Sequence, residues 1–271
     1  MTITRAVVLA AGLGTRMQAA APGTVLDAAQ AAAADAGIKA LVPVGRPLLD
    51  HLLASLADAG ITEVCLVVGP STGAAIRAHV ATLQPTRLAI AFAEQAAPRG
   101  TADALLAAAT WVGAAPFLVL NADNLYPTAA IRALTTLDGE GVIGWPAATL
   151  VAEGNIPAER IRRFALLVPD AAGDLVALVE KPDEADRARL GEGALVGMNL
   201  WAFTPAILEA CRRTTPSVRG ELELPEAVRL AITTLGRRVR VVVGTGGVLD
   251  LSSRHDIADV AARLAGRPVV V

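Results

Sequence analysis

The first 145 residues alternate short apolar runs with longer amphipathic stretches, and this alternation restricts the fold more than any other feature of the sequence. The runs are apolar throughout, as expected of strands that are buried on both faces. Such strands, joined by helices, predict a parallel sheet with helices on both faces. The expected strands are 6–11, 64–68, 88–92, 117–120 and 142–145, and the expected helices are 47–59, 72–83, 101–111 and 128–137.

After residue 145 the pattern changes to one that elaborates the same sheet. The runs 163–168 and 175–179 flank a Pro-, Asp- and Gly-containing segment, which predicts a β-hairpin with a longer loop. The remaining expected elements are strands at 194–203 and 239–243 and helices at 205–213, 222–235 and 254–264. We therefore expect one domain of 271 residues, a length that can bury a large core.

Composition excludes several classes of function. The net charge is −2 with no basic tract, which argues against a nucleic-acid partner. No uninterrupted apolar stretch of about 18 residues exists, so we expect no membrane span. Cys65 and Cys211 lie in apolar segments, as expected of free core thiols in a reducing, cytoplasmic compartment.

A glycine-rich turn, Gly12-Leu13-Gly14-Thr15-Arg16-Met17, directly follows the first expected strand. Glycines let a backbone approach an anion closely, so this arrangement predicts a phosphate-binding loop. A dinucleotide-binding fingerprint has Gly or Ala where this chain has Met17, which disfavours a NAD-dependent dehydrogenase. Arg16 beside the turn favours a site for a triphosphate.

Two aspartates are candidates for a cation site. Asp123 follows the expected strand 117–120, and ligands of open α/β sheets bind at the carboxyl ends of strands. Asp250 follows a Gly-rich segment, and the pair could hold Mg²⁺ together with substrate phosphates. The alternatives are ordinary turn chemistry for Asp123 and a helix cap for Asp250.

Two lysines are candidates for contacts with phosphate. Lys39 precedes an apolar unit and is expected at the start of a strand that faces the same cleft. Lys181, in Glu180-Lys181-Pro182, ends the expected hairpin and would supply a point charge near a cleft. A solvated surface position is the alternative for both.

The segment 18–38 contains seven alanines within the nine positions 28–36, preceded by Asp27 and ended by Gly37. Alanine favours a short, solvated helix. The alternative interpretation is a mobile lid over the glycine-rich turn.

Seven motifs in one order resemble the sugar-nucleotide pyrophosphorylases, nucleotidyltransferases that include the glucose-1-phosphate thymidylyl- and uridylyltransferases. The motifs are the Leu-Ala-Ala-Gly-x-Gly-Thr-Arg-Met loop at 9–17, Lys-x-x-x-Pro-Val at 39–44, Gln95 with Gly-Thr-Ala at 100–102, Asn-Ala-Asp-Asn at 121–124, Glu-Lys-Pro at 180–182, Gly-x-Asn-x-Trp-x-Phe at 197–203 and Arg-Gly-Glu-Leu-Glu at 219–223. The resemblance implies a Rossmann-like α/β fold of the nucleotide-diphospho-sugar transferase type, with a mixed, mainly parallel sheet. It further implies a nucleotide-binding half at 1–145 and a sugar-phosphate-binding half at 146–271.

The resemblance also implies a role for each matching residue. The catalytic set is Arg16, Lys39 and Lys181; the nucleotide-binding set is Ala11, Gly12, Gly14, Gln95, Gly100 and Thr101; the sugar-phosphate-binding set is Glu180, Lys181, Gly197 and Asn199; and the ligands of Mg²⁺ are Asp123 and Asp250.

The reaction that the resemblance implies joins an NTP, with UTP or dTTP favoured, to a sugar 1-phosphate and releases pyrophosphate. The alternatives are a non-catalytic regulatory relative that binds nucleotide sugars, and an enzyme of the same fold with a non-sugar phosphate acceptor. The chain departs from the family in its insertion 18–38, which separates Arg16 from Lys39 by 23 positions. The insertion would alter the entrance to the site or contact a second subunit, so a homo-oligomer stays open.

Overall fold

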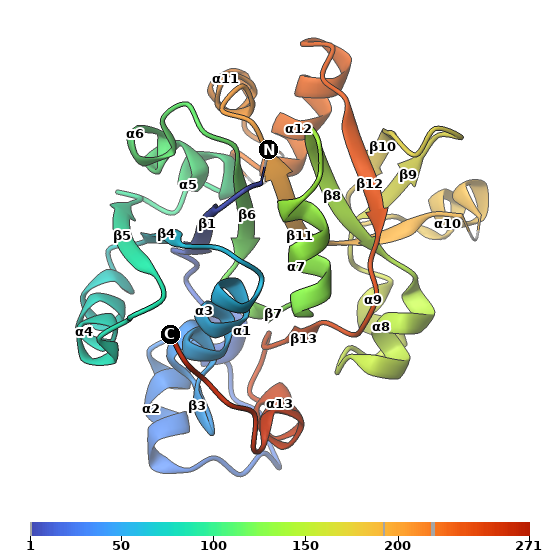
Figure 1. The fold of residues 1–271 in the computed structure, drawn as a ribbon. Helices are drawn as coiled ribbons and strands as arrows, with labels where there is room; N and C mark the ends of the chain where they lie inside the picture. Colours follow the sequence, from blue (N-terminus) through green and yellow to red (C-terminus); the bar gives the residue numbers. More distant parts are fainter. Residues whose placement is uncertain (1, 192, 218–219) are drawn as a thin grey trace.

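The computed structural model describes residues 2–191, 193–217 and 220–271 (Figure 1). The strands are β1 (Arg5–Ala10), β2 (Pro43–Val44), β3 (Arg46–Pro47), β4 (Glu63–Val68), β5 (Ala89–Glu94), β6 (Phe117–Asn121), β7 (Asn124–Leu125), β8 (Glu140–Trp145), β9 (Leu166–Pro169), β10 (Leu175–Val179), β11 (Leu195–Phe203), β12 (Val239–Val243) and β13 (Leu249–Asp250). The helices are α1 (Thr15–Gln18), α2 (Ala28–Asp35), the 3₁₀ helix η1 (Lys39–Leu41), α3 (Leu48–Asp58), α4 (Gly73–Leu83), α5 (Thr101–Ala107), α6 (Ala109–Val112), α7 (Thr128–Thr135), α8 (Ala147–Glu153), α9 (Ala158–Ile161), α10 (Glu184–Leu190), α11 (Ile207–Arg213), α12 (Leu224–Thr233) and α13 (Asp256–Leu264).

Among the described residues, nine strands form one mixed sheet that runs β10-β9-β11-β6-β1-β4-β5, with β8 paired to β11 and β12 paired to β8. The pairs β6–β1, β1–β4 and β4–β5 are parallel, so their carboxyl ends lie at one edge. The fold class predicted from the alternating pattern is confirmed, and the expected helix 101–111 is divided at Ala108 into α5 and α6. In the described part of the chain, no helix is long and apolar enough to cross a membrane.

The second half extends this sheet largely through antiparallel strands. The predicted hairpin is confirmed as β9–β10, and β11 runs antiparallel to β6, β8 and β9. The register between β11 and β8 shifts between Gly197 and Trp201, where Asn199 has a φ of 56°. A β-bulge accounts for both observations, and Asn is among the residues that tolerate positive φ.

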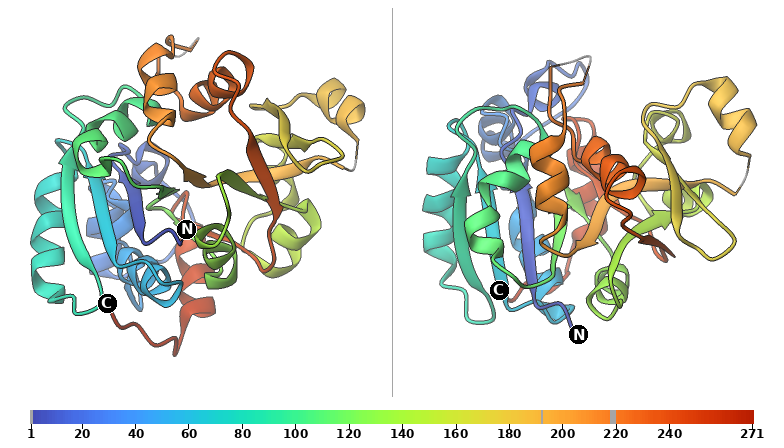
Figure 2. Two further views of the ribbon diagram at one scale, coloured as in Figure 1. Left: turned by 45° about the horizontal axis from the view of Figure 1, so that its top comes forward. Right: turned by 90° about the horizontal axis from the view of Figure 1, so that it is seen from above.

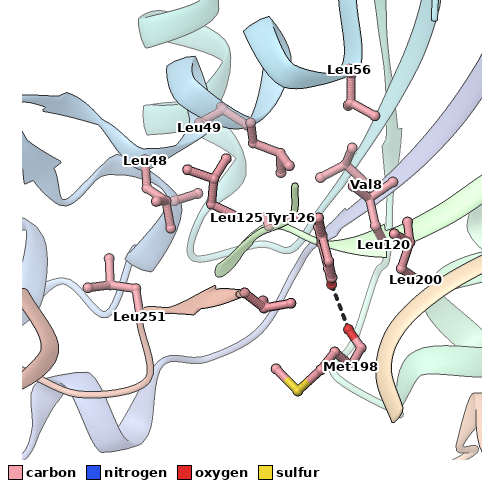
Figure 3. Packing of buried hydrophobic residues seen from close by; sticks show 14 of the residues in the cluster. Val8, Leu48, Leu49, Leu56, Leu120, Leu125, Tyr126, Met198, Leu200 and Leu251 are labelled. Atoms are coloured by element: carbon pink, nitrogen blue, oxygen red, sulfur yellow. Dashed lines mark hydrogen bonds between the residues drawn. The ribbon is translucent and has the colours of Figure 1, made fainter. Parts of the chain in front are cut away.

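Two hydrophobic cores lie on the two faces of the sheet, and Figure 2 shows the sheet and the helices around it from two further sides. Side chains of a strand alternate between faces, so Val8 packs in one core and Val7 in the other. Helices α3, α7 and α13 cover the first core, and α5, α11 and α12 cover the second. Figure 3 shows the first core, where Leu49 and Leu56 of α3 lie near Val8. Each such fully buried leucine contributes about 2 kcal/mol.

The insertion forms the expected helix α2, which lies at the lower left of the ribbon (Figure 1). Asp27 caps it through the backbone N–H of Gln30, whose side chain accepts from the Asp27 N–H in return. Gln30 also donates to the carbonyl of Pro43 at 3.0 Å, and Arg254 pairs with Asp35. These contacts attach α2 to the body of the domain.

Candidate active site

A cavity of about 490 Å³ lies at the edge of the sheet where β1, β5 and β6 end. This is the position at which open α/β sheets bind ligands. Its lining comprises Leu9–Arg16 at and after the end of β1, Gly37–Ala40 around η1, Gln95, Pro98, Gly100, Thr101 and Ala104 after β5, Asn121–Asp123 at and after the end of β6, and Thr72 and Glu221. The residues predicted to bind the nucleotide, to hold Mg²⁺ or to be catalytic line this cavity, except for Asp250 and Lys181.

The glycine-rich turn has the backbone that its sequence predicts. Gly14 has a φ of 63°, and a Cβ there would lie 2.0 Å from the carbonyl oxygen of Gly37, so only glycine fits. A Cβ at Gly12 would meet nothing within 4 Å, which leaves that backbone open to a ligand. The helical turn of α1 buries Met17 completely and leaves Arg16 exposed at the cavity. Met17 is therefore a core residue. Its burial explains why this loop has a large apolar side chain where a dinucleotide-binding fingerprint has Gly or Ala.

Lys39 and Asp123 meet at the cavity, where Lys39 Nζ lies 2.8 Å from Asp123 Oδ2. The strand expected at Lys39 is wrong, because residues 39–41 form a 3₁₀ turn closed by the Val42 N–H to the Lys39 carbonyl. The apolar residues that follow Lys39 do not join the main sheet. The chain turns back at Gly45, which has a φ of 90°, and Pro43–Val44 pair with Arg46–Pro47 in the β2–β3 hairpin.

Asp250 reaches the same region through a short pairing of β13 with β7, which places it opposite Asn124. Asn124 Nδ2 donates to Asp250 Oδ1 at 3.0 Å. The Asn155 side chain accepts from the Asp250 N–H at 2.7 Å and donates to its carbonyl at 2.9 Å. The helix-cap alternative for Asp250 is wrong, because α13 begins six residues later at Asp256.

The Asp250 carboxylate is buried, with 6% of its side chain exposed. Burial first and then the negative charge of Asp123 raise its pKa to about 6, although Arg160 at 3.4 Å partly offsets both effects. Arg160 also pairs with Asp256 at 2.7 Å. Asp250 Oδ2 is buried without a hydrogen-bond partner in the described residues.

This donor set suits a hard divalent cation. Two neighbouring carboxylates repel each other, and Asp250 Oδ2 accepts no hydrogen bond although Arg160 lies 3.4 Å from it, so a cation between the two carboxylates would be stabilised. No group of three or more His, Cys, Asp or Glu side chains in the described ranges could hold a metal. Mg²⁺ ordinarily takes one or two carboxylates and completes its shell with phosphates and water, so the pair is sufficient.

The β5 end of the cavity is built around Gln95 and Gly100. Gln95 Nε2 donates to the Gly100 carbonyl at 2.9 Å and to Asp103 Oδ2 at 2.8 Å. Gly100 has a φ of 111°, and a Cβ there would lie 2.4 Å from the Leu222 carbonyl oxygen. The Thr101 hydroxyl accepts from the Leu224 N–H at 2.8 Å and therefore supports the wall. Arg219 of the 219–223 motif lies outside the described residues.

The residues predicted for the sugar phosphate do not line this cavity. Glu180 and Lys181 are exposed after β10, the last strand at that end of the sheet, and Lys181 has a φ of 46°. Gly197 and Asn199 lie in the bulged part of β11. The bulge is tied to the turn that carries Asp123 through Tyr126, whose hydroxyl donates to the Met198 carbonyl at 2.8 Å (Figure 3).

Three polar residues of the site escaped the sequence reasoning. Asn155 and Arg160 belong to no motif, and only the tertiary fold brings them to Asp250. Asp103 follows Gly100 by three positions, in the first turn of α5, where an acidic residue is usual without any ligand. Its bond to Gln95 joins two segments that the sequence gives no reason to pair.

The chain is similar to known nucleotidyltransferases along most of its length. Residues 5–260 match the family model described as "Nucleotidyl transferase". A glucose-1-phosphate thymidylyltransferase of Streptomyces antibioticus is 34% identical over 97% of this chain and 68% of its own length. A UTP–glucose-1-phosphate uridylyltransferase of Haloferax volcanii is 30% identical over 96% of both chains. The solved structure of a UDP-glucose pyrophosphorylase with UDP-glucose has the same fold, with a TM-score of 0.75 at 18% identity over 98% of this chain and 100% of the other.

Proposed function

Because this chain belongs to the nucleotidyl transferase family and resembles its sugar-nucleotide pyrophosphorylases, we propose that it joins an NTP to a sugar 1-phosphate and releases pyrophosphate. The observation that carries the proposal is one cavity that combines an open glycine turn, Arg16 and the Lys39–Asp123 pair. UTP and dTTP are the favoured nucleotides, as supported by the names of the relatives.

The proposed reaction brings two anions together. A phosphate oxygen of the sugar 1-phosphate attacks the α-phosphorus of the NTP in line, a new P–O bond forms, and the bond from the α-phosphorus to the bridging oxygen breaks. The electron pair leaves with pyrophosphate, so no covalent enzyme intermediate is needed. Catalysis then consists of alignment and charge neutralisation.

The fixed cations have separate tasks in this proposal. Arg16, exposed at the turn, would contact the triphosphate, and Lys39 would orient the α-phosphate from beside Asp123. Lys181, with Glu180, Gly197 and Asn199, would hold the sugar phosphate. Because these four residues lie outside the cavity, the sugar phosphate would enter from the β11 side.

Asp123 and Asp250 are the residues that would hold Mg²⁺. The buried Oδ2 of Asp250, which accepts no hydrogen bond among the described residues, supports this assignment. The bound ion would supply positive charge to the α-phosphate and the departing pyrophosphate. When no ion is bound, Asp250 would be kept in place by its contacts with Asn124, Asn155 and Arg160.

The proposal is tested by measuring pyrophosphate release from each NTP with a panel of sugar 1-phosphates and Mg²⁺. Asp123→Asn should lower kcat at least about 100-fold with the fold intact. Asp259→Asn, an exposed aspartate of α13, is the matched control and should keep full activity. Nucleotide-sugar binding without turnover across the panel would favour a regulatory protein, and turnover only with another phosphate would favour a non-sugar acceptor.

A further inference from the structure

We infer that Arg254 is a positioning residue, which holds the turn that carries Arg16 in the orientation that receives the triphosphate. Arg254 does not line the cavity, and 15% of its side chain is exposed. It therefore acts through the turn and not by contact with the substrate. The inference rests on the proposed function, since it concerns the nucleotide of that reaction.

The helical turn after the glycines needs support from another part of the chain. Helix α1 has only four residues, and a single helical turn is marginal on its own. Within it, the N–H groups of Met17 and Gln18 donate to the Gly14 carbonyl at 2.8 and 3.0 Å. The carbonyls of Met17 and Gln18 lie at the end of α1, where a helix offers them no donor.

Arg254 supplies the donors that these carbonyls lack. Its Nε donates to the Met17 carbonyl at 2.8 Å, and its Nη2 donates to the Gln18 carbonyl at 3.2 Å. The same Nη2 lies 2.5 Å from Asp35 Oδ1, at the end of α2. Because a guanidinium is planar and holds its nitrogens at fixed separations, these three contacts define the position of the end of α1.

The end of the insertion contacts the glycine turn directly as well. Gln18 Nε2 donates to the Asp35 carbonyl at 3.3 Å. The Gly37 carbonyl oxygen occupies the space that a Cβ on Gly14 would need, 2.0 Å from it. The insertion therefore supports the turn twice, once by this packing and once through the carboxylate that orients Arg254.

Arg254 also links the turn to the proposed cation site. It lies in the segment between β13 and α13, where the Leu251 N–H donates to the Asp123 carbonyl at 2.9 Å. Asp256 Oδ2 accepts from the N–H and the hydroxyl of Ser253, at 2.8 and 3.0 Å, and closes this segment. One short segment is thus bonded to both the Asp123 backbone and the turn, so it sets the distance between them.

The experiment compares the Kd of UTP with that of UMP, measured by calorimetry with Mg²⁺ and without a sugar phosphate. UMP lacks the β- and γ-phosphates, so the ratio of the two Kd values reports how the turn contacts those phosphates. The wild-type protein should bind UTP at least about tenfold more tightly than UMP. Arg254→Met should lower this ratio at least about fivefold, whereas a role in stability alone would lower the Tm and leave the ratio unchanged.

Two further variants separate position from charge. Arg254→Lys keeps the positive charge but presents one nitrogen in place of two, so its ratio should fall at least about twofold. Arg263→Met removes an arginine of α13 that contacts Asp259 and the Glu153 carbonyl, and it should keep the wild-type ratio. Without nucleotide, the Gln18 N–H should exchange at least about tenfold faster in Arg254→Met and at the wild-type rate in Arg263→Met.

A wild-type ratio in Arg254→Met, with pyrophosphate release intact, would overturn this inference and leave the proposed function standing. A wild-type ratio in Arg254→Lys would mean that the charge alone matters, which would overturn the positioning role as well. If Arg254→Met does not fold, the ratio of Arg254→Lys decides in the same way. Failure of the wild-type protein to bind any NTP would overturn both proposals.

Discussion

Replacing Asp250 by asparagine should stabilise the metal-free protein at pH 8 while it impairs the enzyme. Burial and the charge of Asp123 raise the pKa of Asp250 from 3.8 to about 6. Between pH 4 and 6 the folded chain consequently holds more protons than the unfolded chain, so stability falls as the pH rises through this window. The penalty is complete above about pH 6, and asparagine, which mimics the neutral carboxyl, does not incur it.

The size of the effect follows from the same shift. A difference of about 2 in pKa corresponds to about 3 kcal/mol at pH 8 and to about half of that at pH 5. Urea denaturation in EDTA at both pH values measures it, with the exposed Asp259→Asn protein as the control. If Asp250→Asn were no more stable than the wild type at pH 8, or if its advantage were the same at pH 5, the electrostatic account of this carboxylate would fail.

Three further predictions concern the turn, the insertion and the metal site. Gly14→Ala forces a Cβ to within 2.0 Å of the Gly37 carbonyl at positive φ, so it should cost at least about 2 kcal/mol, seen as a lower Tm; a wild-type Tm would contradict the packing described. Asp27→Ala removes the cap of α2 and should cost that helix about 1 kcal/mol, measured as faster hydrogen exchange confined to residues 28–35; exchange unchanged there would mean that the cap contributes nothing. Mg²⁺ should raise the Tm of the wild type and not that of Asp123→Asn, whereas equal shifts would place the ion elsewhere.

The parallel half of the sheet was predictable because each of its elements carries a local signal. Continuous apolar runs mark β1, β4 and β6, and burial on both faces is the physical cause of those runs. The glycine turn and the start of α5 were equally readable, since Gly14 in the turn and Gly100 before α5 occupy backbone conformations that other residues rarely adopt. Asp123 was found because it follows directly on a buried strand.

The partners of Asp250 could not be predicted, because they depend on contacts between distant segments. The strands β7 and β13 have two residues each, too few for any periodicity to show. Asn155 and Arg160 lie about 90 residues before Asp250 and carry no pattern that points to it. Lys39 was placed in the right cavity but in the wrong element, since a three-residue 3₁₀ turn and an apolar strand start look alike in sequence.

The pairing of β7 with β13 also sets an order of assembly. The glycine turn, Lys39, Gln95 and Asp123 all lie within the first 123 residues, whereas Asp250 lies 127 residues beyond Asp123. During synthesis the ribosome therefore completes the wall that would receive the nucleotide long before the second carboxylate exists. A contact so distant in sequence is slow to form. The chain would thus be able to bind the metal only after its whole fold has formed.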